Sequence, residues 1–291
     1  MALAVFTAPL RAEDVVTEYN SCEINWTRGV ITAGAEAGFA LAPKGTPVDF
    51  YDGSDTSINR ARMESYHRAR ETALERLMSA VKIIQVEPER NFRDLVNENI
   101  YARKRLSEVL IDLARVRLAP LDFNSAYCEA RLGLGDLVTA VPRDFPGHDF
   151  PSIDDTPLRT EYSGLIVDCR GLKIEPMIFP SIYNEYGLEI YGRIYAEGRS
   201  AARHGLAAYS YSEDEARRHK TAGNRPFYTV ALKSLNGCPV ISDRDTRRVL
   251  SSPQTRNNLK KCRVILILDR KGARGIASRE SANAVPPRET P

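Results

Sequence analysis

Histidine is scarce in this sequence, and the familiar motifs of metal and nucleotide sites are missing. The 291 residues include four histidines, namely His67, His148, His204 and His219. Apart from the loop around His148, none has a second ligand type at metal-site spacing, and His67 fits a surface position. There is no Walker-type glycine loop and no Gly-x-Ser-x-Gly motif. The sequence therefore gives no support for a P-loop nucleotidase or a serine hydrolase of the common type.

Two short segments have the residue types of a site without its full pattern. His148 and Asp149 precede Asp154 and Asp155, but acidic residues between prolines are typical of a solvated linker, which we favour over a hard-cation loop. The run from Gly133 to Val138 lacks the third glycine of a dinucleotide loop, and no βαβ unit follows it. The sequence accordingly predicts no catalytic, cofactor-binding or metal-binding residue and no cofactor.

An excess of positive charge is also missing from the body of the chain. The formal charge of +3 comes from 41 Lys and Arg against 38 Asp and Glu. Residues 270–291 hold five of the basic and two of the acidic residues, which leaves 36 of each for the remainder. Because a nucleic-acid groove needs net positive charge on the folded part, no nucleic-acid partner is expected.

No apolar run is long enough for a transmembrane helix. Residues 1–12 read instead like the second half of a secretory signal peptide, with a short apolar run and small residues before Glu13. We therefore expect an exported protein; the alternative is a frayed N-terminus of a cytosolic protein. Cys22 lacks the preceding residues of a lipid-attachment site, so no lipid anchor is expected there.

The five cysteines are spread along the chain without a Cys-x-x-Cys pair, and their odd number means that not all can be bridged within one chain. Cys169 and Cys262 both lie at predicted strand ends, so a disulfide between them is one hypothesis. Cys169 also follows Asp168 and precedes Arg170, which would suit a reactive thiol. Strand alternation places Cys169 opposite Asp168, however, and this favours a buried structural cysteine.

Hydrophobic periodicity predicts an α+β domain over residues 13–145. Residues 58–84 contain no glycine or proline and have apolar residues at three- and four-residue steps, as in a long amphipathic helix. Those apolar positions are Met63, Tyr66, Ala69, Ala73, Leu77, Ala80, Val81 and Ile84. Around this helix we expect a strand in 24–40, helices near 92–96 and 100–113, and a hairpin of 114–118 with 126–132. The order predicts a sheet with helices on one face.

The proline-rich stretch 141–157 is the best linker candidate, with a boundary near Phe150. Over residues 158–269 we predict a second domain, so that each domain has a mixed or antiparallel sheet with helices packed on it. Its strands are expected at 163–168, 176–183, 188–191, 227–235 and 262–268, the last in a central position, with helices at 212–221 and 242–250. Residues 270–291 are predicted to be a disordered tail.

Several of these segments resemble known bacterial proteins. The strand Trp26-Thr-Arg-Gly-Val-Ile31, the helix from Arg60 to Ile84 and the returning strands resemble the Lpp-twenty lipoprotein family and the N-terminal region of flagellar assembly protein T. Residues 162–172, 180–192 and 261–269 look like the companion region of uncharacterised Gram-negative envelope proteins. The resemblance implies a non-enzymatic role at the periplasm or outer-membrane periphery, in flagellar or other surface assembly.

We therefore hypothesise an exported scaffold or assembly factor that is not an enzyme. Its expected partners are other envelope proteins or further copies of the chain. The alternative is a periplasmic module for a small ligand or glycan, with a stacking surface formed by Tyr183, Tyr186, Tyr191 and Tyr195. A third reading, an enzyme with an unrecognised site, would require ionisable residues brought together by the fold.

Overall fold

The structure is a computed structural model that describes residues 13–151 and 160–270. The chain forms an α+β fold of two domains, as the sequence predicted. The signal-like residues 1–12, Asp154, Asp155 and the predicted tail beyond Arg270 lie outside the described residues. Within the described part, no helix is both long enough and apolar enough to span a bilayer.

An antiparallel sheet forms the backbone of the first domain. Its strands are β1 (Val16–Tyr19), β2 (Cys22–Asn25), β3 (Val30–Gly38), β6 (Arg115–Pro120) and β7 (Ser125–Gly133). They pair in the order β1-β2-β3-β7-β6, which leaves β6 at one edge. Alternation along β3 and β7 buries small residues such as Ala33, Ala35, Ala126 and Ala130 on one face, so a helix can approach closely.

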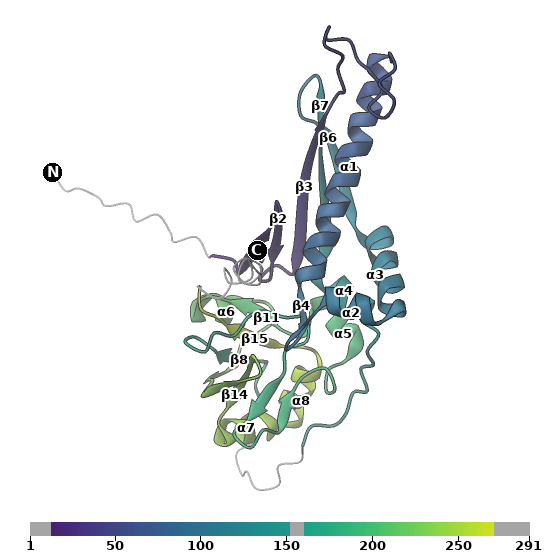
Figure 1. The fold of residues 1–291 in the computed structure, drawn as a ribbon. Coiled ribbons are helices and arrows are strands. Elements are labelled where there is room, and N and C mark those ends of the chain that lie inside the picture. Colours follow the sequence, from purple (N-terminus) through teal and green to yellow (C-terminus); the bar gives the residue numbers. More distant parts are fainter. Residues whose placement is uncertain (1–12, 152–159, 271–291) are drawn as a thin grey trace, which may run out of the picture.

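Helix α1 (Ile58–Ile83) covers that face, which confirms the predicted long helix. It begins at Ser57, whose side chain accepts a hydrogen bond from Arg60 N at 3.3 Å. Ala69, Ala73 and Leu77 are fully buried against the sheet, but Met63 is 58% exposed. Together α1, β3, β6 and β7 form an elongated arm that extends away from the second domain (Figure 1).

Shorter elements gather at the base of this arm. They are α2 (Phe92–Glu98), α3 (Ile100–Leu113), α4 (Leu134–Ala140) and the two-stranded sheet of β4 (Gln85–Glu87) and β5 (Arg90–Asn91). Asn91 and Asp94 form a capping box at the start of α2. The sequence predicted α2, α3 and the β6–β7 hairpin, but not α4.

The second domain contains a wholly parallel sheet. Its strands are β8 (Leu165–Asp168), β11 (Ala208–Ser210), β12 (Phe227–Val230) and β15 (Val264–Ile267), in the order β11-β15-β8-β12. All four residues of β8 and of β15 are buried. Continuous burial is typical of inner parallel strands, and it confirms the predicted central position of β15.

A second, mixed sheet lies in the same domain. It consists of β9 (Ile182–Asn184), β10 (Glu189–Tyr191), β13 (Lys233–Leu235) and β14 (Cys238–Ile241), in the order β10-β9-β14-β13. Two strand predictions were wrong in extent. The run 176–183 is a strand over β9 alone, because Pro176 and Pro180 lack the amide hydrogen that a ladder needs. The run 227–235 divides into β12 and β13, which belong to different sheets.

Four helices complete the second domain: α5 (Gly198–His204), α6 (Glu213–Arg218), α7 (Asp243–Leu250) and α8 (Pro253–Lys260). Ser242 caps α7 by accepting a hydrogen bond from Asp245 N at 3.1 Å, as the sequence predicted. A helix near 212–221 was expected, and α6 occupies part of that range. The helices α5 and α8 were not predicted.

The two domains share a hydrophobic core. A single cluster of buried side chains runs from β3 and α1 into β8 and β15. Ile178 N and Phe179 N donate hydrogen bonds to Gln85 O and Val86 O, both at 2.9 Å, so the segment before β9 adds to β4 of the first domain. In the predicted linker, Phe150 is buried and stacks on Tyr195 with ring centroids 4.7 Å apart. This end of the linker is docked on the second domain.

Candidate functional site

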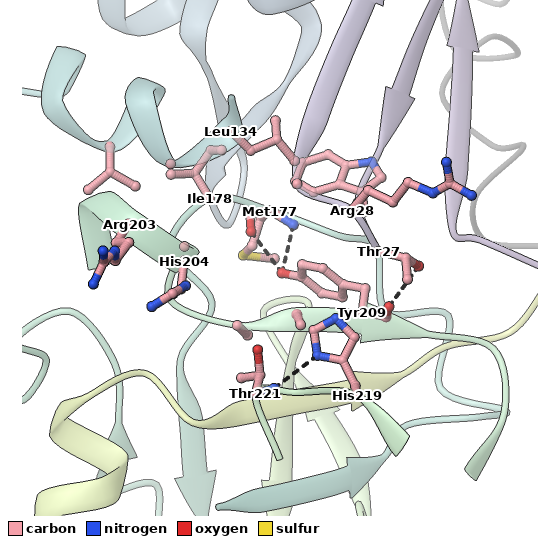
Figure 2. Close-up of a pocket in the computed structure, with 17 residues that line it drawn as sticks. Thr27, Arg28, Leu134, Met177, Ile178, Arg203, His204, Tyr209, His219 and Thr221 are labelled. Atoms are coloured by element: carbon pink, nitrogen blue, oxygen red, sulfur yellow. Dashed lines mark hydrogen bonds between the residues drawn. The ribbon is translucent and has the colours of Figure 1, made fainter. Parts of the chain in front are cut away.

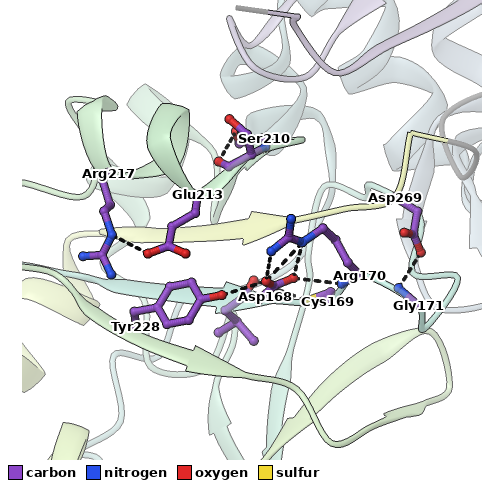
Figure 3. A network of polar contacts seen from close by, with 11 residues as sticks. Asp168, Cys169, Arg170, Gly171, Ser210, Glu213, Arg217, Tyr228 and Asp269 are labelled. Carbon is purple, nitrogen blue, oxygen red and sulfur yellow. Dashed lines mark hydrogen bonds and ion pairs between the residues drawn. The ribbon is translucent and has the colours of Figure 1, made fainter.

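Polar and charged side chains gather at the carboxyl ends of the parallel strands. In open parallel sheets, ligands bind in the crevice beyond these ends. Asp168 ends β8, Ser210 ends β11, and Asp269 lies two residues after β15. Figure 3 shows these residues near Arg170, Tyr228 and the Glu213–Arg217 pair of α6.

Asp168 is the most enclosed acid of this edge, at 6% exposure. Arg170 Nε donates to its two carboxylate oxygens at 2.9 and 3.1 Å, and the Tyr228 hydroxyl donates to Oδ2 at 2.7 Å. Burial alone would raise the pKa of Asp168, but the hydrogen bonds from Arg170 and Tyr228 outweigh it and lower this pKa. Asp168 is therefore held as a carboxylate and is unsuited to act as a general acid.

The two side chains that bind Asp168 are also held in their protonated forms. The hydrogen bond to Asp168 raises the pKa of Arg170, while burial, followed by the contact with Asp168, raises the pKa of Tyr228 to about 12. Around them, Asp269 accepts a hydrogen bond from Gly171 N at 2.7 Å and Glu213 pairs with Arg217 at 2.7 Å. Each of these polar groups is therefore already bound to a neighbour at this edge of the sheet.

Cys169 lies beside this network but is turned away from solvent. It is 1% exposed, and burial, together with the charge of Asp168, raises the pKa of its thiol. A reactive cysteine needs the opposite shift and access to solvent. Arg170, which could have stabilised a thiolate, is instead bound to Asp168. This is the environment of a structural cysteine.

The proposed disulfide between Cys169 and Cys262 is wrong: both thiols are free and buried. The parallel register pairs Val264 with Leu165 and Ile267 with Asp168. Cys262 therefore lies before the amino end of β15, while Cys169 follows the carboxyl end of β8. At about 3.3 Å per residue these positions are roughly 20 Å apart along the strands, against about 7 Å for bridged Cα atoms.

The predicted tyrosine surface does not form. Tyr191 is fully buried and donates a hydrogen bond to Leu206 O at 2.5 Å, and Tyr195 is 6% exposed beneath Phe150. Tyr186 is 79% exposed in the turn before β10. Tyr183 is half-buried on β9. Because Tyr191 and Tyr195 are core residues, they cannot join Tyr183 and Tyr186 in one stacking surface.

The two weak motifs have structural roles. In the loop at 148–149, His148 N donates to Ile194 O at 2.9 Å and Asp149 pairs with Lys260 at 2.9 Å. No group of three potential metal ligands occurs among the described residues. The Gly133 segment starts α4, where the side chain of Asp136 accepts a hydrogen bond from Gly133 N at 3.2 Å.

A cavity of about 500 Å³ lies between the two domains (Figure 2). The first domain contributes the β2–β3 turn, with Thr27 and Arg28, and the start of α4. The second domain contributes Met177 and Ile178, the ends of α5 and α6, and β11. Trp26 meets Tyr209 edge-to-face at 5.7 Å, and Thr27 Oγ1 donates to Tyr209 O at 2.9 Å. These contacts hold the walls in place.

Tyr209 is the most constrained residue of this cavity. Its hydroxyl donates to Met177 O at 2.7 Å and accepts from Met177 N at 3.0 Å. Burial raises the pKa of Tyr209 well above its ordinary value, so the ring stays neutral. His219, on the opposite side of Tyr209 from Met177, accepts a hydrogen bond from Thr221 N at 3.3 Å, and burial lowers its pKa.

The mouth of the cavity is basic. Arg203 and His204 end α5, and His219 follows α6. An adjoining hollow of about 600 Å³ shares His204, His219 and Thr221 and adds Arg218, Lys220, Lys261 and Arg263. No acidic residue is among the described residues that line either hollow. Sequence reasoning missed this group because its members come from distant segments; the signal was the basic ends of two short helices.

A third hollow, of about 660 Å³, is largely apolar and lies on the arm between α1, α3 and β6. Its lining includes Leu74, Met78, Leu110, Ile111 and Val116. Ile111 is 80% exposed, although it is a large aliphatic side chain. We call this hollow the arm groove.

No curated protein was found to match the chain. A protein-family model does match part of it, within the second domain. Residues 164–270, which span the parallel sheet and the mixed sheet described above, are similar to the second domain of Tp0624 from the bacterium Treponema pallidum.

Proposed function

We propose that the chain is a non-enzymatic assembly factor that acts through protein–protein contacts, and that the β6 edge and the arm groove receive an extended segment of its partner. The observation that carries the proposal is the edge strand β6 beside an apolar hollow. Within the described residues β6 pairs with β7 on one side and with no strand on the other.

The arm supplies what strand addition requires. An extended peptide that pairs with an exposed edge gains main-chain hydrogen bonds, while neighbouring pockets select its side chains. Leu118 is 41% exposed on β6, and Ile111 and Val116 border the arm groove. A partner segment with alternating apolar residues would therefore cover both the edge and the groove.

Charge indicates which partner fits. Arg115 and Arg117 are exposed on β6, and their side chains have no acidic partner among the described residues. In an antiparallel pair of two copies of β6, these like charges would lie close together and oppose association. A strand carrying Asp or Glu would instead pair with both. We therefore commit to a partner with an acidic extended segment rather than to a second copy.

Other features support a role without catalysis. Asp168 is held as a carboxylate by Arg170 and Tyr228, and Cys169 is buried with a raised pKa. The proposed location is the periplasm or outer-membrane periphery. Its support is the signal-like start and the resemblance to the Lpp-twenty family and flagellar assembly protein T. Fractionation of native cells that finds the protein in the cytosol alone would refute the proposed location. The proposed contact surface would be unaffected by that result.

The contact surface is tested by changing its charge. We expect Arg115→Glu/Arg117→Glu to lose the partners that wild-type protein cross-links in native cells, identified by quantitative mass spectrometry. Arg115→Lys/Arg117→Lys should keep them. The matched control, Arg105→Glu/Lys233→Glu, changes the same charge at two exposed positions, on α3 and β13.

Two further readouts make the result decisive. Thermal unfolding must show that the glutamate variant remains folded. A synthetic peptide from each captured partner is then titrated against wild-type and variant protein, and an acidic segment should bind the wild type alone. If the same partners bind the glutamate variant equally well, the β6 edge is not the contact surface.

A further inference from the structure

We infer that the cavity between the two domains, with the basic hollow at its mouth, binds a small molecule that carries a phosphate group on an apolar body. The inference is independent of the assembly role, because the cavity lies at the base of the arm and shares no residue with the arm groove.

The charge of the lining is the first argument. Arg203, His204, Arg218, Lys220 and Lys261 line the two hollows, and none of them has an acidic partner among the described residues. Arg28 differs, since its Nε pairs with Asp14 at 2.6 Å. Elsewhere on the protein, arginines such as Arg170, Arg217 and Arg247 pair with acids. Unpaired arginine and lysine side chains that line adjoining hollows attract an anion.

Helix ends explain part of this pattern but not all of it. Basic residues are favourable in the last turn of a helix, and both α5 and α6 have them there. Arg217 serves that purpose while also pairing with Glu213. Lys220, Lys261 and Arg263 lie outside both helices, and they extend the basic lining to the start of β15. Lys261 is the C-cap residue of α8, so the end of a helix accounts for it, but not for Lys220 and Arg263.

The hydrogen-bonding capacity favours phosphate. Arginine binds two phosphate oxygens at once, and lysine adds a mobile point charge, so the group suits an anion with several acceptor oxygens. His219 is already tied by Thr221 N and by a backbone hydrogen bond at Thr27. It therefore positions the wall, while the exposed Arg203 and His204 are the groups available to the ligand.

The interior of the cavity determines the chemistry of the part of the ligand that is not phosphate. Behind the basic mouth lie Leu134, Val138, Met177 and Ile178, together with the rings of Trp26 and Tyr209. A volume of about 500 Å³ exceeds what inorganic phosphate fills and lies in the range of small-molecule sites. The described cavity thus combines an apolar end with an anion-binding end, which a phosphomonoester with a short alkyl or aryl chain would fill.

The test is calorimetric titration of the full chain with hexyl phosphate, inorganic phosphate and hexanol at constant ionic strength. Hexyl phosphate should bind more tightly than either of the others. Arg203→Gln/His204→Gln should weaken hexyl phosphate binding by roughly tenfold or more, because the contacts of these two side chains with the phosphate are lost. Arg105→Gln, which removes an exposed charge on α3 outside the cavity, should leave binding unchanged. Thermal unfolding confirms that each variant is folded.

Two more arms identify the source of the phosphate. Vesicles containing phosphatidic acid, compared with neutral phosphatidylcholine vesicles, test a lipid headgroup; binding that the double variant loses would support a lipid ligand in the same cavity. A single-stranded oligonucleotide that bound more tightly than hexyl phosphate would overturn the inference in favour of nucleic acid. Absence of hexyl phosphate binding, or equal binding by wild type and double variant, would also overturn it.

Discussion

At the scale of single residues, the polar groups around Asp168 are bound to their neighbours. Asp168 illustrates this: burial acts against its charge, and the hydrogen bonds from Arg170 and Tyr228 more than compensate. The sequence suggested that Asp168, Cys169 and Arg170 crowd a strand end, and they do. Strand alternation correctly placed Cys169 opposite Asp168, but the hydrogen bond from Tyr228 to Asp168 could not be predicted, because Tyr228 comes from another strand.

Asp168 makes stability depend on pH in a defined direction. Its folded-state pKa is lowered, so its ionised form stabilises the fold above the unfolded pKa of about 4, and this contribution is lost as pH falls through the folded pKa. Urea unfolding at pH 7 and pH 3 should show Asp168→Asn destabilised by about 1–2 kcal/mol at pH 7, with a smaller difference at pH 3. Asp112→Asn, an exposed carboxylate on α3, should change neither value. Equal losses at both pH values would contradict the assignment.

At the scale of elements, amphipathic segments were predictable and context-dependent ones were not. Helix α1 and the β6–β7 hairpin have periodic burial along their length, so the pattern alone located them. The short α4, α5 and α8 have seven or eight residues each. Such lengths cover about two turns, and packing rather than propensity decides whether they form.

The packing of α4 on α5 depends on Gly135. A Cβ atom there would lie 2.4 Å from Ala202 O, a backbone atom that cannot rotate away. Although alanine favours a helix over glycine by about 1 kcal/mol, we expect Gly135→Ala to destabilise the protein by about 1–3 kcal/mol through this clash. Chemical denaturation measures the effect.

Gly38 is the matched control, because a Cβ atom there would meet its nearest neighbour at an ordinary 3.6 Å. Gly38→Ala should cost less than Gly135→Ala. The reverse order of the two variants would mean that α4 and α5 can separate without loss. The cavity walls would then be less rigid than the contacts at Tyr209 indicate.

At the scale of the whole molecule, the two domains are joined by a hydrophobic cluster that runs from α1 and β3 into β8 and β15. The sequence predicted two domains and a proline-rich connection, since composition changes sharply near residue 141. It did not predict how the domains meet, because Trp26, Met177 and Tyr209 are far apart in the chain. The cavity between the domains was missed for the same reason.

The shared core predicts a single unfolding transition. Trp26 is the one tryptophan of the chain and lies at the junction, so its fluorescence and the far-ultraviolet circular dichroism should change together with temperature. Tyr209→Phe removes two buried hydrogen bonds to Met177. Both probes should report the same loss in the free energy of unfolding, about 1–3 kcal/mol. Tyr186→Phe, at an exposed ring, should have no effect. Separate transitions for the two probes would show that the domains unfold independently.

The segment of residues 176–181 has a practical consequence. The amides of Ile178 and Phe179 donate to Gln85 O and Val86 O, so part of the region that matches the Treponema domain is hydrogen-bonded to the first domain. A truncation that begins at residue 160 would expose Ile178, Phe179 and Tyr209 to solvent. Expressed alone, that fragment should aggregate and be degraded quickly, and a useful truncation must keep the first domain, which holds both β4 and Trp26.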